Sequence, residues 1–302
     1  MITLMHDAEY TRWDYVMKLY YLTDLHVGAK ACDERALKRD IASIADDPDA
    51  RWIGGGDYVD AIGHVGDKRY DPETLAPWAL GCADLMGIQR DYVVDLLTPI
   101  ADKCLGMGDG NHEWMAKKKY GRNLYWEIVS RIADRAGTEP ETIGYGASGF
   151  IVLKFRYRAK NSKGNGWPMT IFCHHGYGGG RLPGGHALTM GRALGDYDSD
   201  LVLMGHRHVA QVQNKVVVRA ARKQRGKPRV SRRVGLFVPS YLSYVPQSKN
   251  GSPVDSYAEH KGLPLQDIGT IPIHIRPAKR KITLLFSNNL ALETKQDVEE
   301  KA

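Results

Sequence analysis

Five short groups of residues in this sequence carry side chains that can bind metal ions or move protons. They are Asp24-Leu25-His26, Gly56-Asp57-Tyr58-Val59-Asp60, Gly110-Asn111-His112-Glu113, His174-His175-Gly176 and Gly205-His206-Arg207-His208. Their donors are carboxylate and amide oxygens and imidazole nitrogens without any thiolate, a set that suits Mn, Fe, Zn or Ni better than a structural zinc. A single Asp-x-His is usually an accident of composition, a helix cap or a satisfied polar pair. The ordered set of five predicts a metal centre.

Two divalent cations held by such donors would suit the cleavage of a phosphoester. Attack on a phosphorus atom that already bears negative charge requires a strong nucleophile at neutral pH and compensation of the added charge. Two cations ~3.5 to 4 Å apart meet both needs, because a water between them becomes hydroxide while the phosphoryl oxygens lie on the same metals. Such a pair needs a bridging carboxylate, and we expect Asp57 to supply it. Asp60 lies further into the following turn, where it could cap a helix or support a ligand.

The donor groups follow apolar stretches that are typical of buried strands. In the first half, strands are predicted at 17–23, 51–55 and 103–107, with helices at 33–46 and 85–100 between them. This alternation implies right-handed crossovers and a mostly parallel sheet, and α/β proteins bind their ligands at the carboxyl ends of such strands. We therefore expect the donors to emerge together at one edge of a sheet.

The second half of the chain is predicted to be mainly sheet. A long helical segment is expected after His112, and 187–194 is the one good helix candidate beyond 144. Short β-rich stretches occupy 150–157, 169–173, 201–204, 216–220, 234–238, 271–275 and 282–286. Two facing sheets with helices outside them would accommodate both halves, and one site would join them. We expect a single domain over 1–302, with a basic β-hairpin insertion at about 215–233 and a frayed tail at about 295–302.

The ordered motifs resemble those of the calcineurin-like metallophosphoesterases. That superfamily is recognised by Asp-x-His, Gly-Asp-x-x, Gly-Asn-His-Asp/Glu, a later His and Gly-His-x-His, and the similarity here runs from about 17 to 210. The resemblance implies an α/β fold: a four-layer α/β/β/α sandwich with two facing mixed β-sheets and a dinuclear metal site at their strand ends. It also implies hydrolysis of phosphoester bonds with a metal-bridging hydroxide.

The same resemblance implies roles for individual side chains. The first metal would be held by Asp24, His26 and His208, the second by Asn111, His206 and one His of the 174/175 pair, and both metals by Asp57. Neighbouring side chains on a strand point to opposite faces, so only one of the pair should face the metals. We expect His174, as in the family's variants where the first His is the ligand, with His175 as the alternative.

His112 is similar to the family's residue at the leaving-group oxygen, which makes it the candidate catalytic residue. An imidazole with a pKa near neutrality can donate a proton to an alkoxide or stabilise its charge. Glu113 would orient that ring or cap the next helix. For substrate binding we expect Arg207, His175 if it is not a ligand, and Arg181, which lies in the glycine-rich segment 176–186. An Arg207 that merely extends into solvent is an equal alternative.

A dense run of positive charge begins shortly after His208. Between 215 and 233 stand nine basic residues and no acidic one: Lys215, Arg219, Arg222, Lys223, Arg225, Lys227, Arg229, Arg232 and Arg233. A hairpin that projects these cations could follow a nucleic-acid backbone, with binding that weakens as salt rises. The alternative is a solvated hairpin without a partner. The closeness of the run to His208 favours a role in substrate binding.

Composition limits the remaining choices. The net charge is +7, the four cysteines form no Cys-x-x-Cys pair, and no stretch approaches the ~20 apolar residues that span a bilayer. We expect a cytoplasmic protein without a membrane partner that binds two divalent ions, Mn first and Fe, Zn or Ni otherwise. It would be a phosphodiesterase, with DNA or RNA as candidate substrates and a nuclease as the candidate activity. The alternatives are a small-molecule phosphatase, a cyclic-nucleotide phosphodiesterase, or a binding or scaffolding protein without turnover.

Overall fold

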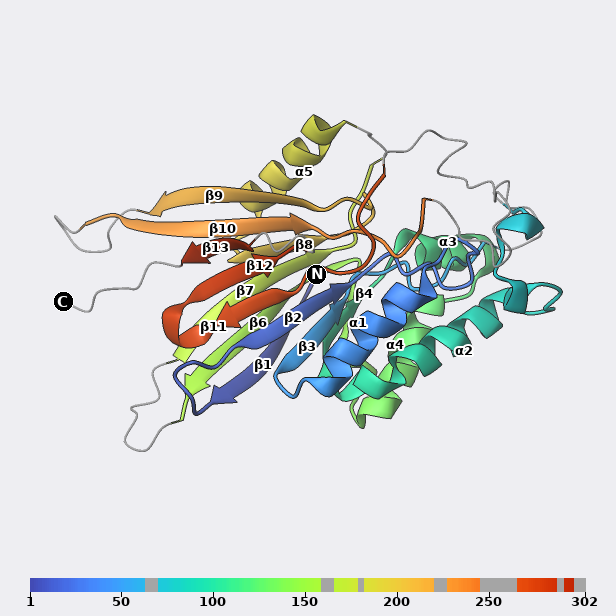
Figure 1. The fold of residues 1–302 in the computed structure, drawn as a ribbon, viewed down its shortest axis with the longest axis horizontal. Coiled ribbons are helices and arrows are strands. Elements are labelled where there is room, and N and C mark those ends of the chain that lie inside the picture. Colours follow the sequence, from blue (N-terminus) through green and yellow to red (C-terminus); the bar gives the residue numbers. More distant parts are fainter. Residues whose placement is uncertain are drawn as a thin grey trace.

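Two β-sheets lie face to face in the computed structural model, with helices on their outer faces (Figure 1). The structure describes residues 1–62, 70–158, 166–178, 182–219, 227–244, 265–286 and 291–295. One sheet, here sheet A, has six strands, and the other, sheet B, has seven. Both are mixed, because each combines parallel with antiparallel pairs.

Sheet B contains the strands that the alternating pattern predicted. β2 (Met17–Leu22), β3 (Ala50–Gly54), β4 (Cys104–Gly108) and β5 (Gly144–Gly146) pair in parallel. Three strands from the end of the chain, β11 (Ile273–Arg276), β12 (Lys281–Leu285) and β13 (Ala291–Lys295), extend the sheet beyond β2 in antiparallel order. The first and last parts of the chain therefore build this sheet together.

Sheet A has the order β1-β6-β7-β8-β10-β9. Its strands are β1 (Ile2–Tyr10), β6 (Ser148–Tyr157), β7 (Gly166–His174), β8 (Leu201–Met204), β9 (Gln211–Arg219) and β10 (Arg229–Phe237). Only β1 comes from the first half of the chain, and the sequence did not predict it. Its inward positions include His6 and Ala8 while Met5 points outward and is exposed, so the apolar alternation of a half-buried strand is blurred.

Apolar side chains fill three layers of contact between the elements. Leu4, Leu19, Ile53, Ile171 and Leu236 belong to the cluster between the two sheets. A second cluster packs α1 (Glu34–Asp46), α2 (Leu85–Leu97) and α4 (Leu124–Ala136) on the outer face of sheet B. A third packs α5 (Pro183–Asp196) on sheet A. The predicted four-layer α/β/β/α arrangement is confirmed.

The long helical segment expected after His112 is two helices. α3 (Asn111–Tyr120) ends at Gly121, whose left-handed φ of 69° suits a glycine at this position. α4 begins after Asn123, whose side chain accepts a hydrogen bond from the backbone N–H of Trp126. Short 3-10 helices cover Pro72–Thr74, Pro77–Ala79, Thr98–Lys103, Pro140–Thr142 and Pro277–Lys279. Among the described residues, no helix is both long enough and apolar enough to cross a membrane.

The basic hairpin is the edge of sheet A. β9 and β10 pair over their full lengths, and β10 also pairs with β8 in parallel. β9 starts shortly after His208 and leads away from it, so its far end lies on the order of 25 Å from its first residue. In Figure 1 this far end is at the left, whereas α3 is at the right. Residues 220–226 and the tail 296–302 lie outside the described residues.

Candidate metal centre

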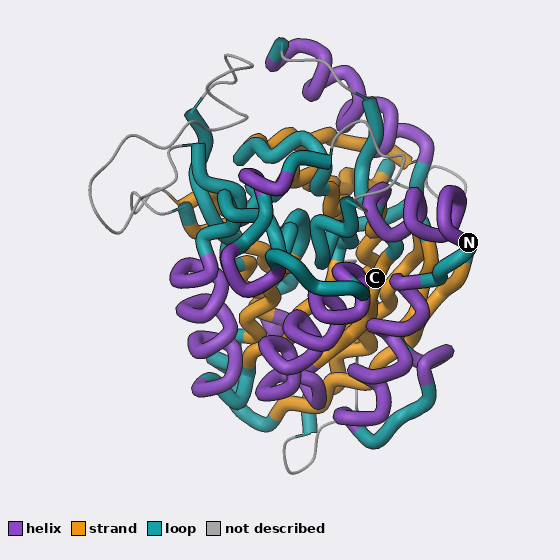
Figure 2. Tube along the Cα trace, turned by 90° about the vertical axis from the view of Figure 1, so that its right-hand side faces the viewer, coloured by secondary structure: helices purple, strands orange, loops and turns teal. Residues whose placement is uncertain are grey.

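The five predicted donor groups meet at one end of the two sheets. β2, β3 and β4 lead directly into the segments of Asp24, Asp57 and Asn111, while β7 and β8 end one or two residues before His175 and His206. Figure 2 looks onto this end, where loops gather between helices on opposite sides of the strands. The expectation that parallel strands would bring these groups to one edge is met in the geometry.

Backbone hydrogen bonds join the loops that carry the donors. Within sheet B, the N–H groups of Asp24 and His26 donate to the carbonyls of Gly56 and Asp57, both at 3.0 Å. Between the sheets, Tyr241 N–H donates to the carbonyl of Asp24 at 3.0 Å. The loops are therefore fixed to one another, which holds donors from distant parts of the chain at constant separations.

Most of the donor residues have an unusual backbone conformation. Among the described residues, seven other than glycine have positive φ, and five of these are Asp24, His26, Asp57, His206 and His208, with φ between 47° and 65°. This left-handed region is disfavoured for residues with a Cβ, although Asp and His enter it more readily than most. Such strain persists only where the surrounding structure enforces it, and it clusters at functional sites. The turn after each strand directs the side chain into the shared space.

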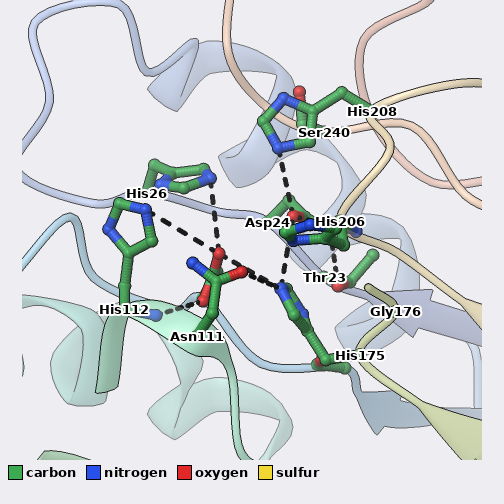
Figure 3. A network of polar contacts seen from close by, with 12 residues as sticks. Thr23, Asp24, His26, Asn111, His112, His175, Gly176, His206, His208 and Ser240 are labelled. Atoms are coloured by element: carbon green, nitrogen blue, oxygen red, sulfur yellow. Dashed lines mark hydrogen bonds and ion pairs between the residues drawn. The ribbon is translucent and has the colours of Figure 1, made fainter. Parts of the chain in front are cut away.

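The donors form two sets. One contains Asp24, His26 and His208 and the other Asp57, His175 and His206, with the ligand atoms of each set within 4.8 Å of one another. A third, overlapping set joins His26 to Asp60 and His112. Figure 3 shows the rings of His26, His112 and His175 pointing toward one another, with His208 above Asp24. The two sets bring together residues that the motifs assign to two metals, with His175 where we expected His174, and their occupation by two metals stays a prediction.

The carboxylate of Asp57 lies between the two sets. Its Oδ2 is 3.2 Å from Nε2 of His175, 3.9 Å from Nε2 of His26 and 4.0 Å from Nε2 of His112. Its Oδ1 accepts a hydrogen bond from the backbone N–H of His112 at 2.8 Å. One oxygen is thus fixed by the start of α3 while the other faces imidazoles from both sets, which is the position a bridging ligand requires.

The ring of His26 shows that these residues fit a cation. The side chain is 3% exposed, and neither of its nitrogens has a hydrogen-bond partner. Burying a polar group without a hydrogen-bond partner lowers stability. A bound cation would provide the partner that the His26 nitrogens lack. Burial lowers the pKa of His26 and of His206, which keeps both rings neutral and their nitrogen lone pairs available.

Contacts to backbone carbonyls orient two other rings. His175 places Nδ1 2.9 Å from the carbonyl of Gly55, and His206 places Nε2 3.1 Å from the carbonyl of Gly178. Because a carbonyl can only accept, each of these nitrogens carries a proton. In His175 the opposite nitrogen, Nε2, faces Asp57 and Asn111. A hydrogen bond of this kind commonly fixes the tautomer of a ligand histidine.

Charges in the cluster influence one another strongly. Burial opposes ionisation of Asp57, but nearby His175 and His112 lower its pKa well below the ordinary value. Burial likewise opposes protonation of His175, but Asp57 and Asp24 raise its pKa to about 10. His175 and these two carboxylates therefore hold one another in charged form without metal. A cation would take over this pairing, and the ring would have to release its proton to bind it.

Two glycines of the motifs leave room for the carboxylates. A Cβ on Gly110 would lie 2.2 Å from Oδ1 of Asp57, and one on Gly205 would lie 2.2 Å from Oδ2 of Asp24. Neither glycine has positive φ, so close approach and not backbone conformation explains the residue type. The Gly-Asn-His and Gly-His-x-His patterns thus each pair a glycine with a carboxylate from another loop.

Glu113 does not take either of the roles expected for it. It is 1% exposed, and its carboxylate accepts hydrogen bonds from the backbone N–H groups of Asp57, Tyr58 and Val59 at 3.0, 2.7 and 3.2 Å. Burial and the nearby Asp57 raise its pKa to about 7. Since His112 N–H in turn binds Asp57, the two acidic residues fix the Asp57 loop and the start of α3 against each other.

The structure brings His175 and not His174 into the cluster. Nε2 of His175 is 2.9 Å from Oδ1 of Asn111 and lies beside Asp57. Nδ1 of His174 instead accepts the N–H of Gly176 at 2.7 Å, and its ring lies near Phe172 and Tyr177. Strand alternation correctly required the two rings to diverge, but it left open which one turns inward, and the family variants suggested the other choice.

The remaining predicted residues are placed as follows. The Nδ1 of His112 contacts the carbonyl of Asp60, and its Nε2 faces Asp57. The carboxylate of Asp60 lies 3.6 Å from Nδ1 of His26 and 3.8 Å from Nδ1 of His112, so Asp60 supports the two rings, and it caps none of the helices in the described part of the chain. Arg207 is half-buried beside Gly178. Arg181 lies outside the described residues, so its role in substrate binding stays a prediction.

Comparisons with known proteins give likenesses of structure only. No family model and no curated protein matches the sequence. Among solved structures, the chain is similar to a predicted phosphoesterase from Streptococcus pneumoniae, at 11% identity over 93% of this chain and 98% of that one, with a TM-score of 0.35. It is also similar to a Vps29 mutant from Entamoeba histolytica, at 11% identity over 92% and 99%, with a TM-score of 0.39. A metallophosphoesterase from Sphaerobacter thermophilus shows 13% identity over 93% and 89%, with a TM-score of 0.34.

The calcineurin-like resemblance extends to the fold. It rests on the ordered motifs and on their meeting at one end of two facing sheets. The comparisons leave the assignment of individual ligands to the local geometry described above.

Removing Glu113 tests how the Asp57 loop is held. Glu113→Ala leaves three buried N–H groups without their acceptor, and because each costs about 1–3 kcal/mol we expect the free energy of unfolding to fall by roughly 3–9 kcal/mol. Glu113→Gln should retain part of this, since the amide keeps one acceptor oxygen. Urea denaturation measures the loss of stability. Calorimetric titration of the folded fraction measures the Mn²⁺ affinity, which should fall if the Asp57 loop is displaced. Glu141→Ala, at an exposed position, is the control and should change stability by less than about 0.5 kcal/mol. Wild-type Mn²⁺ affinity in folded Glu113→Ala would contradict a positioning role.

Neighbouring histidines provide a matched pair for the ligand assignment. We expect His175→Ala to lose about one bound Mn²⁺ per chain, because its Nε2 lies among Asp57, Asp24 and Asn111. His174→Ala should keep the wild-type metal content, because its ring binds Gly176 outside the cluster. Metal content after dialysis, measured by mass spectrometry, distinguishes the two. The reverse result would restore His174 as the ligand.

Proposed function

We propose that this chain is a metal-dependent phosphoesterase that works with two divalent ions. The convergence of donors around Asp57, with a buried His26 ring whose nitrogens have no hydrogen-bond partner, is the observation that carries this proposal. One ion would be held by Asp24, His26 and His208, and the other by Asn111, His175 and His206, with Asp57 shared. Mn²⁺ is our first choice for both, with Fe, Zn or Ni as alternatives.

When bound, such ions would lower the pKa of a water and neutralise charge on the phosphoryl oxygens. The chain's own contribution to the reaction would include a positioned proton donor, His112. Its Nδ1 is held by the carbonyl of Asp60, so Nε2 is the atom that faces the reaction space. Burial opposes protonation of this ring, but Asp57 and Asp60 raise its pKa above the ordinary value. A protonated His112 can give its Nε2 proton to the departing alkoxide.

Phosphodiesters are the substrates we propose first. A diester carries a second substituent beside the reacting phosphate, and exposed aromatic and basic side chains flank the donors on α3. The described strands of the basic hairpin do not favour a nuclease, because β9 leads away from the centre along its whole length. The alternative is a protein that binds partners and catalyses no reaction. The hydrolysis assays described next distinguish it from an enzyme.

Metal dependence is the direct test of this function. We expect protein stripped with EDTA to be inactive toward bis-p-nitrophenyl phosphate and p-nitrophenyl phosphate, and Mn²⁺ to restore hydrolysis, with the diester cleaved faster. Asp57→Asn should lose activity with every metal, because a neutral amide cannot replace a carboxylate shared by two cations. Release of p-nitrophenolate measures the rate. A fully metal-loaded protein that hydrolyses neither ester, nor any cyclic nucleotide or nucleic acid, would refute the enzyme assignment.

Replacing His112 separates proton donation from metal binding. His112→Asn should lower kcat by roughly 10²–10⁴-fold for a diester with an alkyl leaving group, which needs a proton. The loss should be much smaller with a p-nitrophenyl leaving group, which departs as a stable anion. Metal content should stay at the wild-type value. His274→Asn is the control, since His274 pairs with Lys18 near the start of β2, at the opposite end of that strand from Asp24. Equal losses for both leaving groups would contradict the proposed role.

A further inference from the structure

Exposed aromatic side chains lie beside the proposed ligands. Among the described residues, the large exposed aromatic side chains are Trp13, Trp114, Tyr120, Trp126 and Tyr177. Trp114 is 49% exposed and follows Asn111 by three residues, while Tyr177 is 51% exposed and follows His175 by two. The ring of Tyr177 lies 5.8 Å from that of His174, which is outside the donor cluster, whereas Trp114 belongs to the helix that begins at Asn111.

Helical geometry directs Trp114 toward the metal ligands. Asn111, Trp114 and Lys118 are spaced i, i+3 and i+7 along α3, so they share one face of the helix. The opposite face is buried through Glu113 and Ala116. Since side chains lean toward the N-terminus of a helix, the indole leans toward Asn111. Lys118 lies one turn beyond Trp114, about 10 Å along the axis from Asn111.

Positive charge accompanies this aromatic surface. The Nζ of Lys118 lies 5.0 Å from the ring centroid of Trp114, and Lys117 is exposed beside it. No acidic residue lies between Trp114 and Gly121. The helix dipole favours lysines in the last turn of α3, but it does not explain an indole left half exposed at the first turn. An aromatic ring followed by cations suits a ligand that combines a flat base with phosphates.

We propose that Trp114 and Lys118 form a binding surface for the nucleoside part of a nucleotidyl phosphodiester. The base would stack on the indole, and Lys118 would contact a neighbouring phosphate, while the reacting phosphate lies at the donors. Stacking on an aromatic side chain tolerates any base, so this surface selects nucleotides without selecting a sequence. The inference rests on the proposed hydrolysis of phosphodiesters and adds the chemical class of the substrate.

Two substrates with the same leaving group test this surface. They are the p-nitrophenyl ester of thymidine 5′-phosphate and ethyl p-nitrophenyl phosphate, assayed with Mn²⁺. We expect Trp114→Ala to raise KM for the thymidine ester by roughly 5- to 100-fold, the range for loss of one base-stacking contact. Any change with the ethyl ester should be at least fivefold smaller. Trp114→Phe should restore most of the affinity. Lys118→Gln should make binding of the trinucleotide TpTpT, which carries a second phosphate beside the reacting one, less dependent on salt.

Trp13→Ala is the matched control. Trp13 is 61% exposed and packs against Tyr157, before the first residue of β2 and so at the end of the sheets opposite the donors. Its loss should leave the KM for the thymidine ester and the KM for the ethyl ester unchanged. Equal effects of Trp114→Ala on both esters, or none on either, would overturn the inference while leaving phosphodiesterase activity intact. If wild-type protein hydrolyses neither ester, the proposed function fails instead, and calorimetric titration with TpT still decides whether Trp114 binds the base.

Discussion

The buried carboxylate of Asp57 is the constraint around which this end of the molecule is arranged. A carboxylate at 1% exposure is tolerated only when charges and hydrogen bonds compensate its lost hydration. Here one oxygen accepts the N–H of His112 and the other faces imidazoles from three loops. Sheet A supplies His175 and sheet B supplies His26. The compensation is therefore complete only when both sheets are packed together, which couples assembly of the site to assembly of the fold.

The same coupling explains why so much unfavourable local structure is retained. Left-handed backbone at donor positions and a ring of His26 without a hydrogen-bond partner each lower stability. The apolar cluster between the sheets and the bonds that join the loops hold these residues in place. The fold thus fixes the donor positions at a cost in stability, and a site formed in advance would lose less entropy when the proposed ions bind.

Sequence could predict the donors because their chemistry is local, but not the details that depend on packing. Residue type and order identified Asp24, Asp57 and the other groups, and apolar patterns placed them at strand ends. The choice between His174 and His175 depends on the residue at which β7 ends, which no pattern specifies. The direction of the hairpin depends on the pairing of β10 with β8. The role of Glu113 could not be predicted from the sequence, because its partners are backbone N–H groups, which every residue except proline has.

The first turn of α3 shows how one short segment supplies several functions at once. Successive residues of a helix differ by about 100° in direction, so four adjacent side chains face four surroundings. Asn111 faces His175, His112 faces Asp57, Glu113 binds the backbone of the Asp57 loop, and Trp114 is exposed at the edge. The side chains proposed for metal binding, proton transfer and substrate contact, and the carboxylate that positions the Asp57 loop, are thereby held in one rigid element. The helical backbone fixes the distances between these four side chains. Because each points in a different direction, each contacts a different set of groups.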